Sequence, residues 1–346
     1  YLTWEKTRQY DLGLDMDMFN YRLNMKLDYY YKYTSSLIYD IPIPGSLYTF
    51  GAQVENAMEI SNEGLELELQ ADILRESAVS WRMKFNMARN WNRFEKSYSG
   101  KDVVDGDGTL LVAGRPLNGL YVWAHRGYYN SDAEVPRLYK IDGQEIYFNG
   151  VATDGISGAV GDYRLLDLDG DGNPDSYYAG SPLPLAHGGW VNELMWKNFD
   201  LNVLVNFTIG RKMINNRIGL GFSRQSEDVH LTKLFDYRKL RPWDGVNKKP
   251  NAPAWGNSLS MNTDSAIEKV HHLALKQITL GYNLPDRISK KAGLSGVRFF
   301  LTAENLFYLS NYSGGNPEVV NIYTGRDNGD TYPLPRKYTL GLTLNF

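Results

Sequence analysis

The segment from residue 167 to residue 175 places side-chain oxygen atoms at alternate positions around a sharp turn. The oxygens come from Asp167, Asp169, Asp171, Asn173 and Asp175, and Gly172 supplies the turn. Hard divalent cations such as Ca²⁺ and Mg²⁺ prefer clustered oxygen ligands of this kind. The spacing therefore predicts a bound Ca²⁺ or Mg²⁺ that orders the surrounding loop. The alternative is a solvated Asp/Gly turn without metal.

Other signals of catalysis are weak. A helix-loop-helix calcium site needs a bidentate Glu at its twelfth position, which is Tyr178 here, so a calmodulin-like switch is not expected. His271 and His272 are adjacent and would point to opposite faces of a strand, so they would not chelate one metal together. The sequence shows no nucleophile elbow, phosphate loop or zinc signature. We predict that the chain is not an enzyme and holds no organic cofactor.

Strict alternation of apolar and polar residues predicts the elements that carry these side chains. At the carboxyl terminus, Tyr338, Leu340, Leu342, Leu344 and Phe346 alternate with polar or small residues. Side chains of a strand point to opposite faces, so this pattern indicates a sheet with one apolar and one polar surface. Nine segments show such a pattern, near residues 10–18, 21–33, 65–72, 81–87, 187–196, 199–209, 278–284, 297–309 and 336–346. Recurring alternation that ends on an aromatic residue is typical of an antiparallel transmembrane β-barrel.

The amino-acid composition excludes a helical membrane protein and remains compatible with a β-barrel. The 346 residues have a mean hydropathy of -0.43, with no run of the roughly 18 apolar residues that a membrane helix needs. A barrel remains compatible with this hydropathy, since only alternate residues face lipid. The 25 tyrosines and 8 tryptophans suit aromatic girdles at the membrane interfaces. The net charge of -3 does not indicate the basic surface that nucleic-acid binding needs. The absence of cysteine excludes disulfides and thiolate metal sites.

The lengths of the predicted connections give an orientation. Short connections fall near residues 19, 73–79, 197–199 and 285–296, and long loops near 40–57, 95–186, 215–267 and 310–335. Outer-membrane barrels combine short periplasmic turns with long extracellular loops. If the carboxyl terminus is periplasmic, every short connection falls on that side and every long loop outside. The first two strands should be joined near Phe19 by a hairpin of about two residues.

The strand count predicts an incomplete barrel. Bacterial single-chain barrels have an even number of strands, and an open edge in lipid leaves backbone groups unpaired. We expect residues 1–346 to be the carboxyl-terminal strands of a larger barrel, with a plug domain and earlier strands absent from this chain.

Several motifs in a fixed order carry a resemblance to a known family. They are residues 4–7 (WEKT), 11–14 (DLGL), 62–64 (NEG), 167–172 (DLDGDG), 277–285 (QITLGYNLP), 298–307 (RFFLTAENLF), 315–318 (GNPE), 332–333 (YP) and 338–346 (YTLGLTLNF). The chain resembles the carboxyl-terminal part of SusC/RagA-type TonB-dependent outer-membrane transporters over nearly its whole length. The resemblance implies a plugged barrel of roughly 22 strands.

The same resemblance implies active import of a bulky nutrient, an oligosaccharide or a peptide, across the bacterial outer membrane. It implies a SusD-type surface lipoprotein over the barrel mouth and energy delivered by TonB through the missing amino-terminal part. It also implies that Tyr338, Leu340, Leu342, Leu344 and Phe346 form the signal that the barrel-assembly machinery reads.

Aromatic side chains in the long loops are candidate substrate contacts, because sugar recognition uses aromatic platforms beside polar groups. They are Tyr121, Trp123, Tyr128, Tyr129, Trp243 and Trp255. Alternatively, these rings pack the loops together or against the lipoprotein. A passive outer-membrane porin is the second functional hypothesis. A barrel-borne hydrolase using inward carboxylates such as Asp11, Asp15, Glu66 or Glu68 is the third, although a wet barrel interior also explains their alternation.

Overall fold

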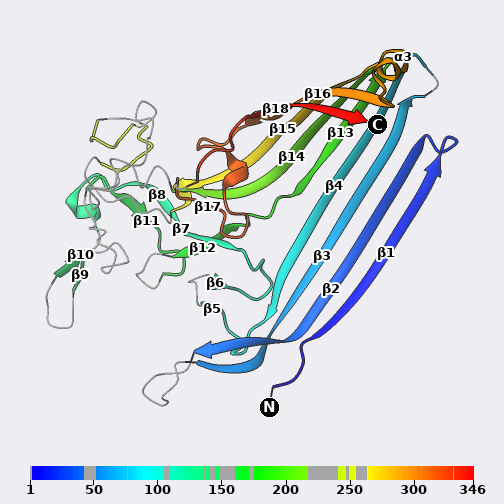
Figure 1. Cartoon of the computed structure of the whole chain (residues 1–346). Coiled ribbons are helices and arrows are strands. Elements are labelled where there is room, and N and C mark those ends of the chain that lie inside the picture. Colours follow the sequence, from blue (N-terminus) through cyan, green and yellow to red (C-terminus); the bar gives the residue numbers. More distant parts are fainter. Residues whose placement is uncertain are drawn as a thin grey trace.

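The computed structural model shows one curved sheet of long, tilted strands with a layer of loops at one end (Figure 1). The structure describes residues 2–42, 52–75, 77–104, 110–135, 137–139, 145–147, 160–170, 175–216, 241–246, 249–254, 263–329 and 331–346. No helix in these ranges is long and apolar enough to cross a membrane.

The main sheet is an antiparallel path of nine long strands in chain order. They are β1 (Lys6–Met18), β2 (Leu23–Pro42), β3 (Ala52–Leu74), β4 (Val79–Lys96), β13 (Ala186–Trp196), β14 (Phe199–Asn215), β15 (Ile267–Asn283), β16 (Gly296–Ser310) and β18 (Lys337–Asn345). A short tenth strand, β17 (Arg326–Asp327), adds to β14 in parallel. The predicted antiparallel barrel architecture is confirmed. β1 and β18 lie at the two ends of the path, so the sheet is an open wall.

Cross-strand register keeps the two faces of this wall distinct. On one row, Met25 lies opposite Leu69, Leu69 opposite Phe85, Phe85 opposite Trp190 and Trp190 opposite Val205. One residue along each strand, Lys26 pairs with Glu68, Glu68 with Asn86, Asn86 with Gly189 and Gly189 with Asn206. We call the apolar surface the outward face and the polar surface the inward face. Leu340 of β18 is 81% exposed on the outward face, as a lipid contact requires.

Short connections gather at one end of the wall with the carboxyl terminus, and long loops gather at the other (Figure 1). The predicted parity of the connections is therefore confirmed. The first hairpin is longer than predicted, since Met18 pairs with Leu23 and four residues form its turn. Phe19, Asn20 and Tyr21 all have positive φ values there. The turn between β15 and β16 contains the short helices α3 (Asp286–Ser289) and η4 (Lys290–Ala292).

Two predicted boundaries were wrong. β15 begins at Ile267, well before residue 278, because a bulge between Leu275 and Gln277 shifts the alternation that marks its second half. β2 and β3 extend to Pro42 and from Ala52, so the first long loop is shorter than 40–57.

The buried core lies among the loops. Short pairs of strands organise the long loops, and three small apolar clusters join them to the ends of the long strands. The short elements are β5 (Val103–Val104), β6 (Leu110–Leu111), β7 (Leu120–Trp123), β8 (His125–Tyr128), η1 (Asp132–Glu134), β9 (Arg137–Tyr139), β10 (Glu145–Tyr147), β11 (Tyr163–Leu165), β12 (Ser176–Gly180), η3 (Asp264–Ala266) and η5 (Pro317–Val319). The loop ends of the long strands are thereby held by packing as well as by hydrogen bonds.

A glycine on the inward face makes room for an aromatic ring. Tyr30 on β2 lies over Gly64 on β3, and Asn90 on β4 donates a hydrogen bond to the Tyr30 hydroxyl. A Cβ at Gly64 would lie 2.4 Å from the tyrosine ring, closer than van der Waals contact permits. The ring therefore ties three strands together only while residue 64 has no side chain.

We expect Gly64→Ala to lower the free energy of unfolding of the complete protein by about 1–3 kcal/mol, as overpacking does in well-packed sites. Urea unfolding in detergent micelles measures the change. Gly296→Ala is the matched control, because its Cβ would meet nothing closer than 3.3 Å. Equal stability of the two variants would contradict the role assigned to Tyr30.

Candidate substrate-contact site on the inward face

A cavity of about 860 Å³ lies on the inward face of β2, β3, β4, β13, β14 and β15. Its lining is mixed: apolar residues such as Val191 and Leu204 lie beside inward positions that carry amide, hydroxyl, imidazole and charged groups. These inward positions include Asn24, Lys26, Glu68, Gln70, Lys84, Asn86, His187, Asn206, Thr208 and His272. Many adjacent hydrogen-bonding groups on a wall of this size suit a bulky polar ligand.

Ion pairs between neighbouring strands occupy the inward face toward the short turns. Lys84 Nζ lies 2.8 Å from Glu193 Oε1, and Arg82 Nε lies 2.7 Å from Asp72 Oδ1. These two ion pairs compensate the charges of four side chains on this part of the inward face. The inward carboxylates Asp72 and Glu193 therefore have cationic partners, which gives them a structural role.

The loop after β16 folds onto the inward face and is held there by a buried arginine. Arg211 of β14, 5% exposed, donates hydrogen bonds to the backbone oxygens of Pro317 at 3.1 Å, Val320 at 2.9 Å and Asn321 at 2.7 Å. The loop then adds β17 alongside the end of β14. We call residues 311–329 the inward loop.

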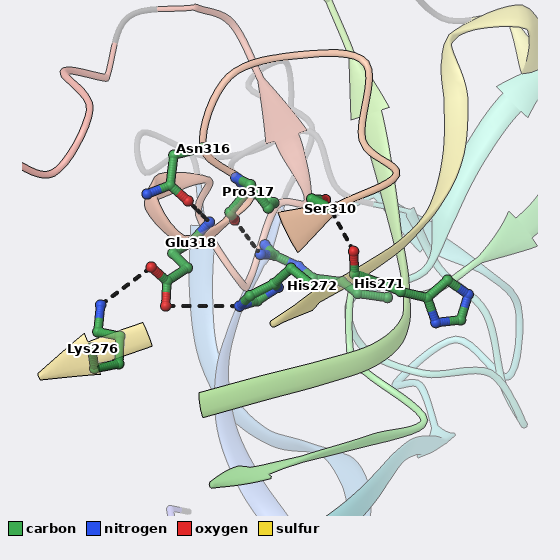
Figure 2. A network of polar contacts seen from close by, with 8 residues as sticks. His271, His272, Lys276, Ser310, Asn316, Pro317 and Glu318 are labelled. Atoms are coloured by element: carbon green, nitrogen blue, oxygen red, sulfur yellow. Dashed lines mark hydrogen bonds and ion pairs between the residues drawn. The ribbon is translucent and has the colours of Figure 1, made fainter. Parts of the chain in front are cut away.

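A carboxylate on the inward loop faces two cations on β15 (Figure 2). Glu318 Oε2 lies 3.2 Å from Lys276 Nζ, and Glu318 Oε1 lies 3.7 Å from His272 Nε2. Asn316 places this carboxylate by accepting a hydrogen bond from the Glu318 backbone N–H at 3.0 Å. His271 points away from the network, so the adjacent histidines occupy opposite faces of β15, as the sequence predicts.

The network is electrostatically favourable and borders the cavity. His272, followed by Lys276, lowers the pKa of the Glu318 carboxyl below its ordinary value. Both Glu318 and His272 line the cavity. The buried Nδ1 atom of His272 has no hydrogen-bond partner within the described part of the chain.

The predicted loop aromatics lie within the loop layer. The Tyr121 and Tyr178 rings are 5.7 Å apart, and the Tyr128 and Tyr163 rings stack at 5.4 Å. Burial raises the pKa of Tyr121 to about 12. Tyr129 is buried, Trp123 belongs to β7, and Trp243 Nε1 donates to Asn130 Oδ1 at 3.2 Å. Trp255 lies outside the described residues. Their part in substrate binding stays a prediction.

Three of the five predicted metal ligands lie together. Asp167, Asp169 and Asp175 each offer a carboxylate oxygen, and these oxygens lie within 4.8 Å of one another. Asp175 also accepts hydrogen bonds from the backbone N–H groups of Leu168 and Asp169. Asp171 and Asn173 lie outside the described residues. The three carboxylates could supply part of an oxygen shell for a hard cation.

Sequence reasoning missed the residues that connect the inward loop to the wall. Arg211 and Lys276 stand where bulges interrupt the alternation of β14 and β15, so a strict two-residue period could not assign their faces. In the sequence, Glu318 was noted only as the last residue of the GNPE motif, with no role assigned to its side chain. Its contacts with His272 and Lys276 depend on how the loop folds back.

Comparisons with known proteins give the family. Residues 1–177 match the model of the family described as TonB dependent receptor-like, beta-barrel. The whole chain aligns at 27% identity with TonB-dependent receptor P3 of Formosa agariphila and at 28% with TonB-dependent receptor SusC of Bacteroides thetaiotaomicron, spanning 34% and 32% of their lengths. The chain thus spans about a third of these relatives.

A solved structure agrees on the fold. The structure of the RagAB peptide transporter matches 99% of this chain with a TM-score of 0.72 and 24% sequence identity, and the chain covers 36% of that structure's chain. The strand order, the polar inward face, the apolar outward face and the family match lead to one conclusion. The chain belongs to the TonB-dependent receptor-like β-barrel family, and SusC of Bacteroides thetaiotaomicron is among its relatives.

Proposed function

We propose that this chain forms part of the barrel of a TonB-dependent importer that carries a bulky nutrient across the bacterial outer membrane. The family match carries the proposal. The open sheet and the third of the relatives' length that the chain spans favour a larger, plugged barrel of roughly 22 strands. In that barrel the short turns and the carboxyl terminus are periplasmic, and the long loops are extracellular.

The nutrient is an oligosaccharide or a peptide in this proposal. The polar groups that line the 860 Å³ cavity offer donors and acceptors to the hydroxyl or amide groups of such a nutrient. One relative by structure is named a peptide transporter, which favours the peptide. The loop aromatics Tyr121, Trp123 and Trp243 would face the nutrient or the partner that delivers it.

The partners follow from the same proposal. A SusD-type surface lipoprotein would cover the loop end of the barrel, TonB would supply energy through the plug-bearing part, and the barrel-assembly machinery would read the final strand from Tyr338 to Phe346. The strong exposure of Tyr338, Leu340 and Phe346 on the outward face suits that last role.

We expect uptake of the nutrient to require TonB. Cells carrying the complete protein would be given fluorescent oligosaccharides and peptides, with and without TonB, and internal label would be measured. Uptake of one ligand class that disappears without TonB is the expected result. Uptake that persists without TonB would favour a passive porin, and hydrolysis of the ligand by the purified protein would favour a barrel-borne hydrolase.

The Glu318 network should hold the inward loop at neutral pH. Glu318→Gln removes a charge-assisted interaction, which contributes about 1.5–3 kcal/mol in buried settings. The chain has no cysteine, so a spin label at Ile322→Cys can report loop motion. We expect greater mobility in the Glu318→Gln variant. Glu304→Gln, which breaks the 3.5 Å pair with Lys337 outside the loop, is the control and should leave mobility unchanged.

Acid should reproduce that effect in the unaltered protein. The folded pKa of Glu318 is lowered, so its contribution to loop docking is present above the ordinary glutamate pKa, 4.5, and is lost as pH falls through the lowered value. Label mobility should therefore rise below about pH 4.5 and stay insensitive to pH in Glu318→Gln. A pH response of equal size in both proteins would contradict this assignment.

A structural Ca²⁺ or Mg²⁺ on the 167–175 segment is a further part of the proposal. Calorimetric titration of the complete protein should show saturable Ca²⁺ binding that Asp169→Asn weakens at least tenfold, because a carboxylate ligand is lost while the backbone bonds to Asp175 remain. Asp132→Asn, an exposed carboxylate elsewhere in the loops, is the control. Identical titrations of both variants would favour a solvated turn.

A further inference from the structure

The outward face changes from apolar to basic at one height near the loop end of the wall. On β4, the outward series runs through Phe85 and Met87 and then becomes Arg89, Trp91 and Arg93. On β15, Leu275 and Leu273 give way to His271 and Lys269 in the same direction. Lys212 follows Ile209 on the outward face of β14. Three strands therefore place cations just beyond the apolar band.

A cleft of about 520 Å³ opens at this boundary between β4 and β14. It exists because β13 begins only at Ala186, whereas its two neighbours β4 and β14 continue further toward the loops. Arg89, Trp91, Lys212, Lys269 and Tyr178 line it, and none of the described residues that line it is acidic. The cleft thus has three cations beside aromatic rings.

The cations of the cleft are arranged in a way that favours an anion. Lys212 and Lys269 are direct cross-strand partners, and like charges in that position repel each other. The Arg89 guanidinium lies 4.3 Å from the centre of the Trp91 ring, which keeps it at the cleft. Arg115 lies 4.7 Å from the centre of the Tyr178 ring beside it. An anion between Lys212 and Lys269 would relieve their repulsion.

Nearby acids are engaged elsewhere. Glu63, opposite Trp91, accepts a hydrogen bond from the Tyr29 hydroxyl at 3.1 Å. Glu268, next to Lys269 in sequence, belongs to the inward face and accepts bonds from Asn215 and Ser313. Neither carboxylate belongs to the cleft wall. Lys212 Nζ donates a hydrogen bond to the backbone oxygen of Ala179, which leaves its charge uncompensated, and no described residue of the cleft wall supplies a carboxylate.

We propose that this cleft binds the phosphate of an anionic membrane lipid at the loop end of the barrel. The cations would contact the phosphate, Trp91 would lie at headgroup level, and the acyl chains would extend along the apolar band of Phe85, Met87 and Phe207. The inference rests on the membrane placement in the proposed function. It concerns the outward face, and no step of nutrient import enters it.

The test is lipid retention by the complete protein purified in detergent. Native mass spectrometry would count phosphorylated glycolipid and its dephosphorylated form on the unaltered protein and on the triple variant Arg89→Gln, Lys212→Gln, Lys269→Gln. We expect the triple variant to retain phosphorylated lipid about tenfold less, because each cation near a membrane surface adds to anion attraction. Dephosphorylated lipid should bind both proteins equally weakly.

A matched control removes the same charge at the other end of the wall. Arg287→Gln, Lys290→Gln, Lys291→Gln neutralises three exposed cations near the short turns and should leave retention unchanged. Unchanged far-ultraviolet circular dichroism would show that both variants fold. Equal retention of phosphorylated lipid by the two triple variants would overturn the proposal, and so would retention of dephosphorylated lipid as strong as that of the phosphorylated form. Displacement by millimolar inorganic phosphate would also overturn it in favour of a free-anion site. If the unaltered protein retained phosphorylated lipid but imported no nutrient in a TonB-dependent way, only the proposed function would be contradicted.

Discussion

Backbone hydrogen bonding in a medium without water is the constraint on which the rest of this structure depends. A strand in lipid must have a neighbour on each side, because an unpaired N–H or C=O group there costs several kcal/mol. Within the described residues, the seven strands between β1 and β18 satisfy this demand on both sides, whereas β1 and β18 are each paired on one side. Alternation then follows, since each strand must present apolar residues to lipid and can present polar residues only to the other side. The polar inward face is thus a by-product of spanning the membrane.

Past the apolar band, the same strands need other means of support. β4 and β14 continue beyond the start of β13, and the loops take over the pairing there. Phe94 exchanges backbone hydrogen bonds with the 114–115 segment, and Leu185 donates to Ile209. Arg211 performs the corresponding task for the inward loop by satisfying three of its carbonyl oxygens. The separation of β4 from β14 therefore creates both the anchoring surface for the loops and the basic cleft on the outward face.

Sequence reasoning succeeded where structure depends on local period and failed where it depends on bulges or distant contacts. The alternation of Phe199 to Ile209 predicted β14, and the terminal alternation predicted β18, because lipid exposure imposes a two-residue period. The first half of β15 was missed because the bulge at Lys276 reverses the phase of the pattern. Likewise, nothing near Glu318 in sequence shows that Lys276 and His272 lie beside it, since 42 residues separate the first pair.

Bulges also decide what the two faces can do. Lys276 at the β15 bulge joins Glu318 and His272 on the inward face. Closer to the long loops on the same strand, His271 and Lys269 face outward. Bulges near the loop end of β14 and β15 interrupt the two-residue alternation, so the residue types on both faces of these strands change at nearly the same height. The inward face gains a charged contact that holds a loop beside the cavity, and the outward face gains cations where the apolar band ends. On β14 and β15, the bulges therefore set which charged residues face each of the two proposed binding surfaces.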